Sequence, residues 1–189
     1  MNLLDIVLGV IILLFVVRGI LQGLFKEGIG LAGIILGVVL GINRYQQLGR
    51  AISSQFGILS LKISNIIAFI IIFGGIAILG AIAGIVIHNL LSRHPFTRGV
   101  EKAGGLILGL AEGALVCSVI LILLTISPFA KNLNSWSKGS ILKPYIMRVC
   151  PFVYDSIVSI TPGKAKKFME KLNPSKPQNL SLKKIKLNS

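Results

Sequence analysis

Acidic residues are scarce in this chain of 189 residues, which has six Asp and Glu against 20 Lys and Arg. Charged residues make up only 14% of it, hydrophobic residues make up 53%, and the mean hydropathy is +0.84. A water-soluble domain of this length would spread its apolar residues in stripes along helices or strands. Here they form long unbroken runs, so the composition excludes an ordinary soluble domain and predicts an integral membrane protein.

The sequence has only two cysteines and two histidines, which are few residues from which to form disulfides or metal sites. Cys117 lies inside an apolar run and Cys150 in the tail, so we expect both to be free thiols. His88 and His94 are six residues apart, with no Cys or carboxylate placed to complete a zinc pattern. We expect neither a metal nor a cofactor.

Catalytic signatures are missing as well. The sequence contains no recognisable nucleophile and base, paired carboxylates, phosphate-binding loop or cofactor fingerprint, so we expect no enzyme activity. The net charge of +14 raises the question of nucleic acid, but twelve of the 20 basic residues follow Pro128, and few aromatic residues lie among them. A basic tail on a membrane core predicts contact with anionic lipids and no nucleic-acid partner.

Four apolar runs are candidates for helices that span the bilayer, which takes about 20 residues. They cover residues 3–17, 28–42, 66–87 and 103–126. The first two runs are short, so each must extend into the stretch between them. The predicted fold class is therefore all-α, a polytopic membrane protein with four transmembrane helices, interfacial helices and a basic C-terminal tail.

The connection between the first two runs, RGILQGLFKE, is predicted to be the tip of a tight antiparallel hairpin in the headgroup zone. Arg18 and Lys26 can extend from there to lipid phosphate. Gly19 and Gly23 are one helical turn apart and would let the two helices approach each other.

Two further segments have apolar residues at helical spacing and predict short helices lying in the membrane interface, residues 43–62 and residues 142–160. The domain division that follows is a four-helix transmembrane domain at 1–127, an interfacial amphipathic segment at 128–162 and a basic tail without stable structure at 163–189.

Small residues recur every fourth position in the spans. The clearest ladders are Gly33, Gly37 and Gly41 in the second span and Gly105, Gly109 and Gly113 in the fourth. Helices in lipid associate through close backbone contact, which such rows permit, although glycine is also generally frequent in membrane helices. The ladders predict tight packing of the spans with one another or with a second copy of the chain.

Glu112 is the one acid near the middle of a span, where an ionised carboxyl is costly. It can pair with a polar group of another helix, such as Arg18 or His88, can belong to an ion or proton pathway, or can reach the interface if the helix tilts. Asp5 and Glu27 each lie in the first turn of a predicted helix, near the headgroups, where an acid is favourable. Glu27 can also form an ion pair at the hairpin tip.

Four spans place both termini on the same side of the membrane. Basic residues close to the spans number six on that side and five on the other. The positive-inside rule therefore leaves the orientation open.

The chain resembles the colicin V production protein family over residues 5–144. Near the start, D-x-x-x-G and R-G-x-x-x-G-x-x-x-E elements are formed by Asp5, Gly9, Arg18, Gly19, Gly23 and Glu27. An element similar to D-R-x-x-G-x-x-x-G-x-x-x-G at the fourth span is formed by Glu101, Lys102, Gly105, Gly109 and Gly113. A W-S-x-x-x-L-x-P-like element follows as Trp136, Ser137, Ser140, Leu142 and Pro144.

This resemblance implies a multi-pass protein of the bacterial inner membrane, needed for production or export of a peptide toxin in hosts that carry one and otherwise for the cell envelope. The partners expected are the lipid bilayer, a second copy, or secretion and envelope membrane proteins. Two other functions remain open: a small transporter or channel that uses Glu112, and a membrane adaptor whose basic tail binds anionic lipid.

Overall fold

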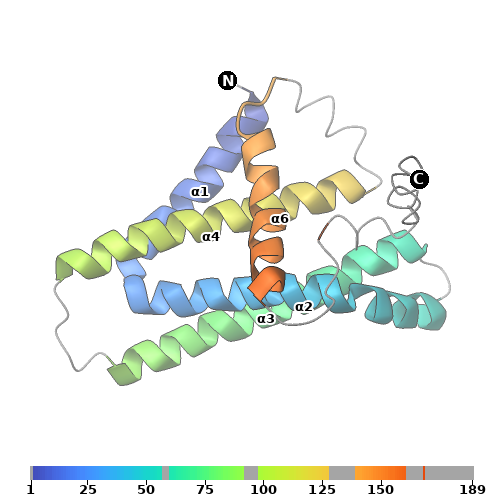
Figure 1. Cartoon of the computed structure of the whole chain (residues 1–189), viewed down its shortest axis with the longest axis horizontal. Helices are drawn as coiled ribbons and strands as arrows, with labels where there is room; N and C mark the ends of the chain where they lie inside the picture. The colour runs from blue at the N-terminus through green and yellow to red at the C-terminus, as the bar shows by residue number, and fades with distance from the viewer. Residues whose placement is uncertain (1, 57–59, 92–97, 128–138, 161–167, 169–189) are drawn as a thin grey trace, which may run out of the picture.

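The structure is a computed structural model that describes residues 2–56, 60–91, 98–127, 139–160 and 168. These residues form helices and no strand, and the helices are α1 (Leu3–Gln22), α2 (Leu24–Phe56), α3 (Leu61–Leu91), α4 (Arg98–Ile126) and α6 (Lys143–Ile160) (Figure 1). The first four are long and apolar enough to cross a membrane. The prediction of an all-α protein with four spanning helices is confirmed.

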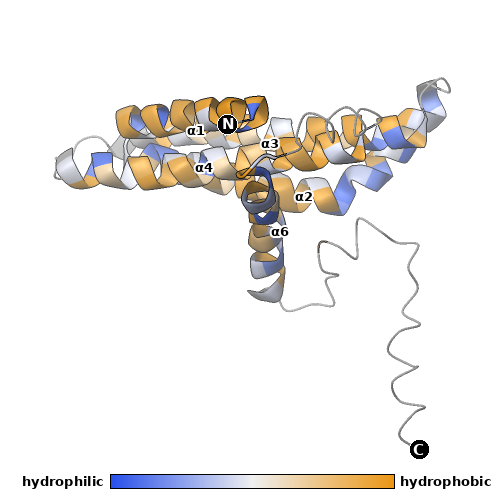
Figure 2. Ribbon diagram, turned by 90° about the horizontal axis from the view of Figure 1, so that it is seen from above, coloured by the Kyte–Doolittle hydropathy of each residue, from blue (hydrophilic) through white to orange (hydrophobic). Residues whose placement is uncertain are grey.

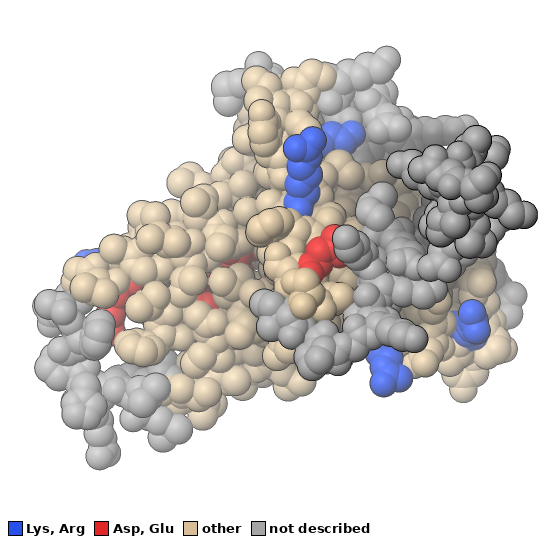
Figure 3. Space-filling model, viewed as in Figure 1, with Lys and Arg blue, Asp and Glu red and all other residues tan. Residues whose placement is uncertain are grey.

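The four spanning helices pack in an open row. α1 lies mainly against α4, α4 also lies against α2, and α2 lies against α3. α6 crosses over α4 and α2 (Figure 1). On the face drawn in Figure 3, most of the described surface carries no charged residue, and the Lys, Arg, Asp and Glu that it shows lie at a few separate places.

The predicted hairpin at residues 18–27 is wrong in its geometry. α1 continues to Gln22 and α2 begins at Leu24, so the break is Gly23 alone, with φ +79°. Glycine adopts this left-handed backbone without the penalty that a Cβ brings. The turn redirects the chain within one residue, and α1 and α2 then diverge, because each packs chiefly against a different helix.

The predicted interfacial helix at residues 43–62 is also wrong. α2 continues without interruption through this polar segment to Phe56, and α3 begins at Leu61. A helix of 33 residues is about 50 Å long, whereas the hydrocarbon core is about 30 Å thick. The polar end of α2 therefore extends beyond its apolar part (Figure 2).

The glycine ladder of α2 faces α3. A Cβ added at Gly33 would lie 2.7 Å from the Cα of Gly80, so these two backbones touch. Gly37 and Gly41 make room for Phe73 and Phe69, whose rings are stacked 5.7 Å apart. Close backbone contact of this kind is how helices associate in lipid.

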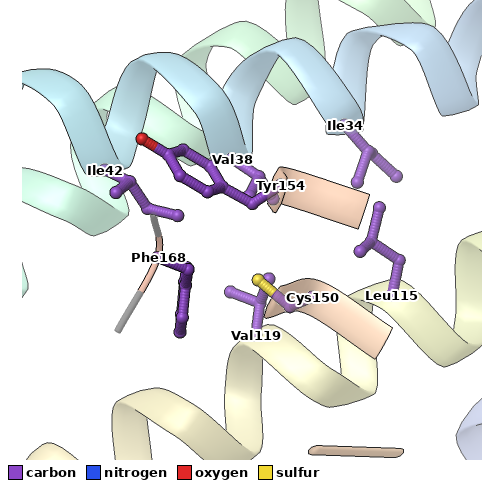
Figure 4. Packing of buried hydrophobic residues seen from close by; sticks show 8 residues of the cluster. All are labelled: Ile34, Val38, Ile42, Leu115, Val119, Cys150, Tyr154 and Phe168. Carbon is purple, nitrogen blue, oxygen red and sulfur yellow. The ribbon is translucent and has the colours of Figure 1, made fainter. Parts of the chain in front are cut away.

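α6 is helical, as the amphipathic pattern of residues 142–160 predicted. Part of its apolar side packs against other helices of the protein, whereas the prediction placed that side against lipid. Cys150 and Tyr154 are buried in a cluster that α2 and α4 complete (Figure 4). The backbone N–H of Cys150 donates to Ser118 Oγ on α4 at 3.0 Å. Cys117 is buried too, and both cysteines are free thiols.

Candidate functional site

Glycines of α1 and α4 bring these two helices into backbone contact. A Cβ at Gly19 would collide with the carbonyl oxygen of Gly105, and one at Gly109 would lie 2.5 Å from the carbonyl oxygen of Phe15. Gly113 lies against the Phe15 side chain. Gly19 thus serves the approach of α1 to α4, whereas the sequence pattern predicted that it serves the approach of α1 to α2.

Arg18 points to Glu112 across this interface. Its Nη1 lies 3.6 Å from Glu112 Oε1, and the side chains are 36% and 2% exposed, respectively. The guanidinium also lies over the Phe15 ring, 5.7 Å from its centroid. Arg18 therefore pairs with a buried acidic residue of α4, instead of marking a hairpin tip.

Glu27 lies in the same region and is fully buried. Within the described residues, neither of its carboxylate oxygens has a hydrogen-bond partner, and neither does Glu112 Oε2. Its charge acts on Glu112, so the two acids are near neighbours. Glu27 lies in the first turn of α2, as predicted, and packing of α2 on α4 encloses its side chain.

Gly30 of α2 faces the ion pair of Arg18 and Glu112. A Cβ there would lie 3.9 Å from Glu112 Oε1 and 4.0 Å from Arg18 Nη2. We refer to Arg18, Glu27 and Glu112 as the buried charge cluster. A cavity of about 240 Å³ beside it is lined by Arg18, Gly30 and Glu112 together with apolar residues of α1 to α4.

The charge balance of this cluster sets its chemistry. One guanidinium faces two carboxyl groups, so full ionisation would leave one uncompensated negative charge away from water. Such a charge is costly, and it is relieved by a proton, a bound cation or a partner's basic group. The cluster can therefore act as a structural lock between α1, α2 and α4 or as a site that exchanges a cation.

Asp5 binds the start of α6. It accepts hydrogen bonds from Ser140 Oγ at 2.5 Å and from the backbone N–H groups of Ile141 and Leu142, each at 3.2 Å. Ser140 Oγ in turn accepts from the N–H of Lys143 at 3.2 Å. The first N–H groups of a helix have no partner within the helix, and a negative charge suits them. Asp5 lies in the first turn of α1, as predicted, and is only 8% exposed because it caps α6.

The other motif residues have simpler surroundings. Glu101 lies in the first turn of α4 and Lys102 follows it, and the Cβ of Glu101 is 3.8 Å from the position that a Cβ would take at Gly23. Gly9 has open space around it. Trp136, Ser137 and His94 lie outside the described residues, as does the side chain of His88.

The sequence analysis named Arg18 as one candidate partner of Glu112, and the structure confirms this pair, but the partners of Asp5 were missed. The role of Ser140 could have been predicted from the sequence, because a Ser shortly before a Pro, here Pro144, is typical of a helix start. The roles of Gly30 and Ser118 could not have been predicted, since they depend on which helices become neighbours.

The three motif elements meet in space. Asp5 from the first contacts Ser140 and Leu142 from the third. Gly19 from the first contacts Gly105 from the second. The residues of the three motif elements therefore form the contacts of α1 with α4 and with the start of α6.

Comparison with known proteins gives one family. The family model described as "Colicin V production protein" matches residues 4–151. Searches of curated proteins and of solved structures gave no match. Since the match covers well over half of the sequence and includes α1 to α4, this multi-pass membrane protein belongs to the colicin V production protein family.

Proposed function

We propose that the protein is a non-enzymatic component of the bacterial inner membrane that supports production or export of a peptide toxin in hosts that carry one, and otherwise the cell envelope. It would act by packing its helices against a second copy or against secretion and envelope membrane proteins. Family membership supports the general role. The observation that supports the mode of action is the open edge of the helix row at α3.

The outer side of α3 has the features of a helix-packing surface. Gly74 and Gly75 meet nothing of the described chain within 4 Å. The neighbouring Ile71 and Ile78 are 54% and 62% exposed. Two adjacent glycines expose backbone between bulky side chains, and such notches allow close approach of another membrane helix.

Gly75→Leu tests this proposal, because the added side chain meets open space in the chain itself and is expected to leave the fold intact. Tagged wild type and variant are purified from membranes in mild detergent, and the co-purifying proteins, including an untagged second copy, are identified by mass spectrometry. The variant is expected to lose a partner that the wild type retains. Leu14→Ala, at a side chain that is 64% exposed on α1, away from α3, is the control. An unchanged partner set in Gly75→Leu contradicts the proposal.

The buried charge cluster supports a second candidate, a small transporter or channel. The ion pair of Glu112 with Arg18 lies next to a second buried acid, Glu27, and next to a cavity. Glu112→Gln would abolish function in a transporter, but would only alter stability or assembly in a packing protein.

The third candidate is the adaptor that binds anionic lipid through residues 163–189. Phe168 is the one described residue of this segment, buried against Tyr154, with its N–H donating to Asp155 at 2.8 Å. Deletion of residues 169–189, which keeps Phe168, would abolish function in this candidate alone.

A further inference from the structure

A larger cavity, of about 340 Å³, lies between α2, α3, α4 and α6. Its walls are mostly apolar and include Ile66 and Phe69 of α3, Val119 and Ile122 of α4, and Cys150 of α6. The volume lies at the lower end of the range for small-molecule sites, which is roughly 300–1,000 Å³. An occupant that matches these walls must itself be mainly hydrocarbon, because a buried polar group without a partner is costly.

The polar residues that line the cavity lie where α2 and α3 change between apolar and polar sequence. Tyr45 and Gln46 follow the point at which α2 turns from apolar to polar, and Gln46 Nε2 donates to Tyr45 Oη at 3.0 Å. Lys62 and Asn65 lie at the start of α3, where the chain turns from polar to apolar. Such transitions, and tyrosine in particular, mark the headgroup level of a bilayer.

The charged residue that lines the cavity at the headgroup level is basic. Lys62 is exposed, and the residues that line the cavity include no Asp or Glu. At the rim, Ile126 of α4 also lines the cavity and is 41% exposed, so the apolar wall continues to the lipid-facing surface. A molecule held here would have its chain among apolar side chains and an anionic end beside Lys62.

We propose that this cavity binds an acyl chain of an anionic phospholipid from the surrounding bilayer, with the lipid headgroup at Lys62. The walls favour the chain through dispersion contacts that an empty cavity would lack. The ammonium of Lys62 favours a headgroup with net negative charge over a zwitterionic one. The site is distinct from the buried charge cluster and does not involve residues 163–189, with the exception of Phe168 in its wall.

The full-length protein is reconstituted in bilayers of equal phosphatidylglycerol and phosphatidylcholine with identical acyl chains, extracted in mild detergent, and analysed by native mass spectrometry for retained lipid. Wild type is expected to retain phosphatidylglycerol with about fivefold preference, the effect of one lysine near the headgroups. Lys62→Gln is expected to retain both lipids about equally. Arg148→Gln, which removes an exposed charge on α6 away from the cavity lining, is the control and should keep the preference.

Ile122→Trp fills the cavity and is expected to lose both lipids, whereas Leu79→Trp on the exposed side of α3 should retain them. If Ile122→Trp does not yield folded protein, Ile66→Trp on the facing wall replaces it. The proposal is overturned if wild type retains no lipid, if it retains both lipids equally, or if the filled variant retains as much lipid as wild type.

Discussion

Single glycines decide how closely α1 approaches α4. Replacing Gly19 by Ala places a Cβ against the backbone of Gly105, which cannot rotate away as a side chain would. We expect Gly19→Ala to destabilise the fold by about 1–3 kcal/mol, the usual cost of overpacking. Thermal unfolding of the purified protein in detergent, followed by circular dichroism, would show this as a lower melting temperature.

Gly9→Ala is the matched control for this change. Gly9 lies in the same helix, and a Cβ there meets nothing within 4 Å. Ala is the better helix former, so its melting temperature should stay the same or rise slightly. Equal destabilisation by Gly9→Ala and Gly19→Ala would mean that the α1–α4 contact is not as close as described.

The ion pair of Arg18 with Glu112 can be tested by a double-mutant cycle. Arg18→Gln leaves two neighbouring carboxyls without their cation and should destabilise the protein by about 1–3 kcal/mol. Glu112→Gln should cost less, because it also relieves the repulsion from Glu27. The double variant should therefore be more stable than Arg18→Gln alone in the same thermal assay. Strictly additive effects would show that the two side chains do not interact.

At the scale of elements, α6 is held to the spanning helices by hydrogen bonds at two points. Asp5 caps its N-terminus, and further along the helix Ser118 binds the backbone of Cys150. Burial raises the pKa of the Cys150 thiol to about 12, so the reactive thiolate is rare at neutral pH while α6 is docked. Cys150 is therefore a reporter of whether α6 lies on α4 and α2.

Asp5→Ala should loosen α6, because three donors at its start lose their acceptor. A loss of about 1–2 kcal/mol in docking should speed alkylation of Cys150 roughly 5- to 30-fold. The rate is measured with a maleimide in a Cys117→Ala background, which leaves Cys150 as the single thiol. Ser156→Ala, which removes a hydroxyl bonded within α6 itself, should leave the rate unchanged. A rate in Asp5→Ala equal to that of the parent would show that Asp5 does not hold α6 in place.

At the scale of the whole molecule, four spanning helices determine which segments share a side of the membrane. The far end of α2 must lie on the side of the termini, and the start of α4 on the opposite side. Gln55 and Gly99 are exposed at these two ends. Cysteines introduced at them provide a direct test.

Gln55→Cys and Gly99→Cys, each in a cysteine-free background, should react with an impermeant maleimide from opposite faces. Intact spheroplasts should label one position and inverted membrane vesicles the other. The position labelled in spheroplasts also establishes the orientation, which the distribution of basic residues left open. Labelling of both from one face would rule out the four-span topology.

Much of this protein follows from its sequence because the bilayer acts on local properties. The lengths of the apolar runs predicted four spanning helices, since hydrocarbon thickness fixes the number of residues needed. The glycine ladders correctly indicated close packing, because only small residues let backbones touch. Motif order along the chain was sufficient to identify the family.

Which surfaces become neighbours was decided by the tertiary structure alone. Asp5 and Ser140 are 135 positions apart, and nothing local to either indicates the other. Glu27 starts a helix, as predicted, but its enclosure by the packing of α2 on α4 could not be read from the sequence. A sequence shows that a charge or a glycine needs a partner. Only the packing order α1, α4, α2, α3 determines which one it meets, because that order depends on the summed contacts of whole helices.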